Sequence, residues 1–102
     1  MRLTRSQRET LVSCVRQFVG EDIDVRVFGS RLDDARRGGD LDLLLVSPTP
    51  ISLLTHAELK QALETHLQLP VDIVTYTQGD KPTPFQAMAL KRSQSVDVGN
   101  AA

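Results

Sequence analysis

Cysteine and large aromatic residues are scarce in this chain of 102 residues, which has no tryptophan, one tyrosine and one cysteine, Cys14. A single thiol excludes an internal disulfide and a cysteine-based zinc site, and it fits a small buried side chain in a reducing compartment. No apolar run approaches the length of a membrane-spanning helix, and none follows the N-terminus as it would in a signal peptide. These absences predict a cytoplasmic protein with no membrane partner.

An excess of charge of one sign is also missing, since 12 Lys and Arg residues face 13 Asp and Glu residues. This balance gives no electrostatic reason to expect direct binding to nucleic acid. The length supports one domain with a modest core. We expect that domain to span residues 1–92, and residues 93–102, which lack an apolar pattern, to form a flexible tail.

The most informative feature of the chain is a pair of carboxylates, Asp40 and Asp42, that follows Gly29-Ser30 after nine residues. Alternate residues of a strand lie on the same face, so the two like charges would lie side by side. This arrangement indicates a cation between them, and Mg²⁺ is the favoured ion because it prefers carboxylate oxygens and accompanies nucleotide phosphates. Gly29-Ser30 would suit those phosphates, since glycine permits close approach and the serine adds a hydroxyl donor.

The segments Val27 to Arg31 and Gly38 to Leu43 resemble the signature of the polymerase-β-like nucleotidyltransferase superfamily. Their shared pattern is an apolar strand, Gly-Ser, and then Asp-apolar-Asp-apolar. Asp72, within Val71 to Val74, matches the position and context of the third carboxylate of that family. The short chain also resembles the minimal nucleotidyltransferases of bacteria and archaea. The resemblance implies an α/β (α+β) fold of the polymerase β type.

The same resemblance implies roles for individual residues. Asp40, Asp42 and Asp72 would be the catalytic residues and the ligands of two Mg²⁺ ions, with Asp72 also able to take the proton of the acceptor hydroxyl. Gly29, Ser30 and Arg31 would bind the phosphates of a nucleoside triphosphate, which family habit suggests is ATP. Without this context, Asp40 and Asp42 would be interpreted as solvated residues at the start of a strand.

Periodicity and turn residues predict a small mixed sheet of about three strands with helices packed on one face. A first helix would begin at a capping box of Ser6 and Glu9 and end at Gly20, and a second would begin at Thr55 and Glu58 and end before Pro70. A short third helix is expected over residues 85–91. The expected strands are residues 25–28, 41–46 and 71–76.

Alternation along these strands separates two faces of the sheet. One face is wholly apolar and should pack on helices: Val25, Val27, Leu41, Leu43, Leu45, Val71 and Ile73. The other carries the candidate carboxylates: Arg26, Phe28, Asp40, Asp42, Leu44, Asp72 and Val74. We expect this second face to be an open cleft with an apolar floor of Phe28, Leu44 and Val74.

Minimal nucleotidyltransferases resemble the antitoxins of two-gene toxin–antitoxin pairs whose toxin is a helical HEPN ribonuclease. In that family the small protein transfers AMP from ATP to a tyrosine of the toxin, which implies a complex of two different chains. One alternative is a transferase for small molecules, like the aminoglycoside-modifying relatives, although those use a further helical domain. Another is a binding module that neutralises its partner by occlusion. Two departures from the family pattern are Gly39, where many relatives have serine, and the loop charges Asp33 and Asp34.

Overall fold

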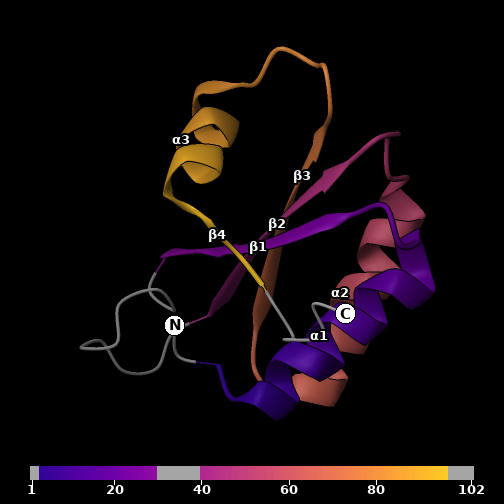
Figure 1. Ribbon diagram of the computed structural model, residues 1–102. Helices are drawn as coiled ribbons and strands as arrows, with labels where there is room; N and C mark the ends of the chain where they lie inside the picture. Colours follow the sequence, from indigo (N-terminus) through magenta and orange to yellow (C-terminus); the bar gives the residue numbers. More distant parts are fainter. Residues whose placement is uncertain (1–2, 30–39, 97–102) are drawn as a thin grey trace.

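The computed structural model describes residues 3–29 and 40–96. The helices and strands follow one another in the order α1 (Arg5–Val19), β1 (Asp24–Phe28), β2 (Leu41–Ser47), α2 (Leu53–Leu67), β3 (Val71–Thr77), α3 (Pro84–Arg92) and β4 (Gln94–Ser95). The strands form one sheet in the order β3-β2-β1-β4 (Figure 1). The predicted mixed α/β fold is confirmed, with a short fourth strand beyond the three that were expected.

The sheet combines both kinds of strand pairing. β1 runs antiparallel to β2 and to β4, whereas β2 and β3 are parallel. Parallel neighbours need a crossover connection, and α2 provides it between β2 and β3. This β2-α2-β3 unit brings residues 41–47 and 71–77 into register.

The helix starts differ from the sequence-based expectation. α1 is capped by Thr4, whose side chain accepts a hydrogen bond from the Gln7 amide at 3.0 Å while the Gln7 side chain accepts one from the Thr4 amide at 2.9 Å. The predicted box of Ser6 and Glu9 is therefore wrong, because burial of Leu3 in the core places the chain entry two residues earlier. α2 likewise begins after Ser52 rather than at Thr55.

The main core lies between the sheet and the helix pair α1 and α2, which cover the same face (Figure 1). All seven residues predicted for the apolar face belong to it, six of them buried and Ile73 partly buried. From α1 and α2 come the buried side chains of Leu11, Val15, Leu59 and Leu63. The alternation of the strands therefore predicted this face correctly.

The opposite face differs from the prediction, because α3 covers part of it (Figure 1). Phe28, Leu44 and Val46 are buried there with Ala89 of α3, and Val74 packs against them. The expected open apolar floor is therefore wrong: the small side chain of Ala89 lets the helix approach the sheet closely and remove these residues from water. Helices thus lie on both faces of the sheet, not on one.

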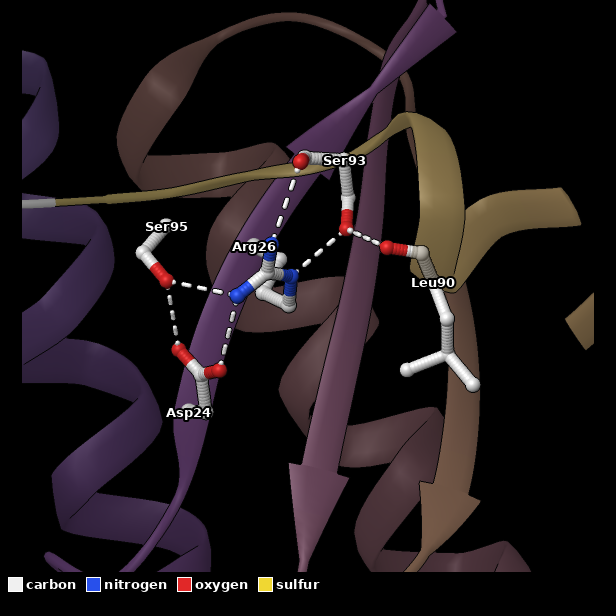
Figure 2. A network of polar contacts seen from close by, with 5 residues as sticks. All are labelled: Asp24, Arg26, Leu90, Ser93 and Ser95. Atoms are coloured by element: carbon white, nitrogen blue, oxygen red, sulfur yellow. Dashed lines mark hydrogen bonds and ion pairs between the residues drawn. The ribbon is translucent and has the colours of Figure 1, made fainter. Parts of the chain in front are cut away.

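A polar network attaches the chain after α3 to β1 (Figure 2). The Arg26 guanidinium donates to the Ser93 hydroxyl at 2.6 Å, the Ser93 carbonyl at 3.1 Å and the Ser95 hydroxyl at 2.8 Å. It also pairs with Asp24 at 3.0 Å, and Asp24 accepts a hydrogen bond from Ser95. These contacts hold β4 against the edge of β1.

Across residues 3–29 and 40–96, no helix combines the length and apolar character needed to cross a bilayer.

Candidate active site

Two of the three predicted carboxylates are brought together by the register of the sheet. Asp42 pairs with Phe28 of β1 on one side and with Asp72 of β3 on the other. These three residues form one row across the sheet, at the end where β1 finishes and β2 and β3 begin. Asp40 lies immediately before β2 and is exposed, while Asp42 is half-buried and the Asp72 carboxylate is 60% exposed.

Asp42 is the electrostatic centre of this group. Partial burial raises the pKa of its carboxyl above the ordinary value, and the charges of Asp72 and then Asp40 raise it further. The charges of Asp72 and Asp40 therefore disfavour the ionised form of Asp42. A cation bound beside Asp42 would relieve that repulsion.

The absence of a side chain at Gly29 suits both the backbone conformation after β1 and the position of the Asp42 carboxylate. Its φ of +79° lies in the left-handed region, which side chains rarely adopt. A Cβ built on Gly29 would collide with the Asp42 carboxylate, since it would lie 3.2 Å from Cγ and closer still to Oδ2. The glycine thus gives the carboxylate the space it occupies, a role that spacing alone did not indicate.

The donor set fits a hard divalent cation, because three carboxylates supply the oxygen ligands that Mg²⁺ prefers. Within the described part of the chain, however, no three Asp, Glu, His or Cys side chains are close enough together to hold an ion. Asp42 and Asp72 are neighbours across two paired strands, whereas Asp40 precedes the strand. The assignment of all three as metal ligands therefore stays a prediction.

Several predicted site residues lie outside the described residues. Ser30 and Arg31, expected to bind phosphate, belong to this group, as do Gly39, Asp33 and Asp34. Their roles stay predictions.

Two charged residues beside Asp72 were missed by sequence reasoning. Lys60 Nζ lies 3.9 Å from Asp72 Oδ1 and 3.2 Å from Glu64 Oε2, and Glu64 Oε2 accepts a hydrogen bond from the Val71 amide at 2.9 Å. That backbone bond, followed by the Lys60 hydrogen bond, lowers the pKa of Glu64. The spacing of Lys60 and Glu64, four apart on a helix, was the available signal.

Tyr76 and His56 have structural contacts. The Tyr76 side chain packs against Phe28, Leu44 and Val46 and donates a hydrogen bond to the Asp80 carbonyl. These contacts favour a packing role over stacking on a nucleobase. Nε2 of His56 lies 2.9 Å from the Ile73 carbonyl oxygen.

Comparison with known proteins supports the resemblance in the sequence. The profile of the nucleotidyltransferase domain family matches residues 8–96. A solved structure assigned to the minimal nucleotidyltransferases is 35% identical, with 88% of this chain and 89% of that chain covered and a TM-score of 0.65. The comparison with curated proteins finds no match.

Two further solved structures share the fold at 16% identity. One is a toxin–antitoxin complex with AMP-PNP, with a TM-score of 0.73 over 93% of this chain and 73% of that chain. The other is a tri-AMPylated HEPN toxin from Shewanella oneidensis in complex with its MNT antitoxin, with a TM-score of 0.70 over 92% and 72%. The family profile covers most of the chain, the minimal nucleotidyltransferase matches it nearly end to end, and the chain therefore belongs to the nucleotidyltransferase domain family.

Proposed function

We propose that this protein is a Mg²⁺-dependent nucleotidyltransferase that transfers AMP from ATP to a hydroxyl group of a protein partner. The observation that carries the proposal is the pairing of Asp42 with Asp72 across β2 and β3, beside a glycine that leaves room for the Asp42 carboxylate. Membership of the nucleotidyltransferase family supports the reaction type.

In the proposed reaction, the acceptor oxygen attacks the α-phosphorus of ATP. A new P–O bond forms, the bond from the α-phosphorus to the bridging oxygen breaks, and pyrophosphate leaves with that electron pair. Asp72 would take the proton from the acceptor hydroxyl, a role supported by its greater exposure in the Asp42–Asp72 pair. Mg²⁺, held by Asp40, Asp42 and Asp72, would supply charge neutralisation on the phosphates. Asp42, whose ionisation is costly without a cation, would anchor it.

A protein acceptor is supported by the surface beside the carboxylates. Phe85 of α3 packs edge-on against Phe28 with ring centroids 6.0 Å apart, and Phe28 pairs with Asp42. Phe85 remains 49% exposed, so an accessible apolar side chain packs on the strand neighbour of Asp42. Met88, on the same helix, is 38% exposed. One fold neighbour is a complex of an MNT antitoxin with a HEPN toxin and another is a toxin–antitoxin complex, and both support a helical HEPN-type partner.

The proposal is tested by following the two ends of ATP separately. The purified protein is incubated with Mg²⁺ and the product of the adjacent gene, using ATP labelled at either the α- or the γ-phosphorus. Nucleotidyl transfer predicts that the α-label becomes covalently attached to the partner and the γ-label is released in pyrophosphate. Attachment of the γ-label would contradict the proposal, and suppression of a toxic partner without either label would favour occlusion.

A further inference from the structure

The outer edge of β3 is closed by side chains of α2. β3 is an edge strand, so the peptide groups that face away from β2 need partners other than a strand. His56, Lys60 and Glu64 follow one another at intervals of four on α2, which places them along one side of the helix. His56 contacts the Ile73 carbonyl, Lys60 donates to the Val71 carbonyl, and Glu64 accepts from the Val71 amide.

Glu64 contacts two groups that neighbour Asp72, the Val71 amide and the Lys60 ammonium. Its Oε2 atom is the acceptor for the Val71 amide at 2.9 Å, and Val71 directly precedes Asp72. The same atom lies 3.2 Å from Lys60 Nζ, whereas Asp72 Oδ1 lies 3.9 Å from that ammonium. Lys60 is thus within reach of two carboxylates and lies closer to Glu64.

We propose that Glu64 is a positioning residue for Asp72: it fixes the Val71 peptide and holds the Lys60 ammonium, which leaves the Asp72 carboxylate free for a divalent cation. This inference rests on the proposed function, since it concerns the same metal site. Glu64 itself touches neither substrate nor cation in this account.

The start of β3 is held from its inner side as well. The Leu41 amide donates to the Pro70 carbonyl at 2.9 Å, and Leu41 pairs with Val71 in the parallel ladder. Loss of Glu64 would leave this inner contact and the Lys60 bond to the Val71 carbonyl, and it would free the Val71 amide. It would also release Lys60 to pair with Asp72, so the two consequences weaken cation binding in the same direction.

Mn²⁺ binding to the full chain, measured by electron paramagnetic resonance, tests this role without depending on turnover. Changes to residues that position metal ligands typically weaken affinity about 10–100-fold, and we expect a loss of at least about 10-fold for Glu64→Ala. Glu58→Ala, at an exposed position of the same helix, is the matched control and should bind as the wild type does. Adding Lys60→Met to Glu64→Ala should restore part of the affinity, because it removes the competing ammonium.

Two further measurements separate positioning from general damage to the fold. In an Asp72→Asn background, Glu64→Ala should weaken Mn²⁺ binding no further, because the residue through which it acts is gone. Without metal, amide hydrogen exchange at Val71 should accelerate in Glu64→Ala while exchange in β1 stays unchanged. If Glu64→Ala does not fold, Glu64→Gln carries the test, since it keeps an acceptor oxygen for Val71 and loses the charge that holds Lys60.

The outcomes distinguish the two proposals. If folded Glu64→Ala binds Mn²⁺ with wild-type affinity, the role of Glu64 is overturned and the metal site is unaffected. Where Glu64→Ala does not fold, wild-type affinity in Glu64→Gln has the same meaning. The role of Glu64 would also be overturned if Glu64→Ala weakened Mn²⁺ binding by the same factor in the Asp72→Asn background as in the wild-type background. If Asp42→Asn binds Mn²⁺ as tightly as the wild type, both the metal site and this inference are overturned.

Discussion

Gly29 and Asp42 occupy one small space where β1 ends and β2 begins. The glycine adopts a φ that disfavours side chains, and the carboxylate fills the position that a Cβ would take. Sequence reasoning assigned this glycine to phosphate approach alone. The structure adds that its lack of a side chain also permits the observed position of Asp42, so one residue affects both stability and the geometry of the site.

Gly29→Ala should therefore be more damaging than an alanine at another glycine of similar conformation. Gly79 has a φ of +91° and open space around it, so Gly79→Ala should cost about 1 kcal/mol of unfolding free energy from backbone strain alone. Gly29→Ala should cost more, because the strain is joined by the collision with Asp42. Urea unfolding of both variants checks this, and equal losses would show that the carboxylate moves aside freely.

Asp42 should make the stability of the metal-free protein depend on pH. Its pKa is raised in the fold, so the native state binds the proton more tightly than the unfolded chain does, and ionisation destabilises the protein. Stability should decline as pH rises from the ordinary aspartate range through the raised value. Asp42→Asn should consequently melt at a higher temperature than the wild type at about pH 7 in the presence of a chelator.

That gain should shrink as the pH falls from the raised pKa of Asp42 to below the ordinary aspartate range, where Asp42 is protonated in both states. Thermal unfolding in parallel with Asp22→Asn, an exposed residue beyond the other end of β1, controls for the change in net charge. A stabilisation of Asp42→Asn no greater than that of Asp22→Asn would contradict the assigned electrostatics.

Among the elements, those with strong local patterns were predicted well. The runs around Val25, Leu41 and Val71 have alternating or continuous apolar residues, and each forms a strand. The start of α1 was missed because two capping boxes compete within a few residues, and the burial of Leu3 decides between them. Local propensity does not contain that information.

The elements near the C-terminus depend on contacts far along the chain. β4 is only Gln94–Ser95, both exposed and polar, and has no strand signal of its own. It forms because Arg26, 67 residues before Ser93, binds both Ser93 and Ser95 (Figure 2). α3 was expected, yet its packing over Phe28 and Leu44 could not be predicted from its own short apolar pattern.

Arg26→Leu should loosen this end of the molecule. It removes the hydrogen bonds to Ser93 and Ser95 and the ion pair with Asp24, and hydrogen bonds to charged groups suggest a cost of about 2 kcal/mol in unfolding free energy. Arg5→Leu breaks only an exposed pair with Glu9 and should cost less than about 0.5 kcal/mol. Urea unfolding gives both values, and similar losses in the two variants would contradict the role of the network.

At the scale of the whole molecule, the candidate site depends on how the sheet is assembled. The motif in the sequence indicated Asp40, Asp42 and Asp72 as candidates, and the register places Asp42 beside Asp72 as the strand alternation predicted. The contacts of Lys60 and Glu64 with the start of β3 could not be predicted from sequence, because they depend on how α2 lies along the edge of β3. The helices fix the sheet, and the sheet aligns the carboxylates.

We propose that the Asp42–Asp72 pair supports nucleotidyl transfer to a protein. Its most direct test is transfer of label from α-³²P-ATP to the product of the adjacent gene, with Mg²⁺, by wild-type protein and by Asp42→Asn. Transfer that depends on this carboxylate pair predicts a labelled partner with the wild type and none with the variant, although the variant folds and is at least as stable. Equal labelling by Asp42→Asn would contradict it.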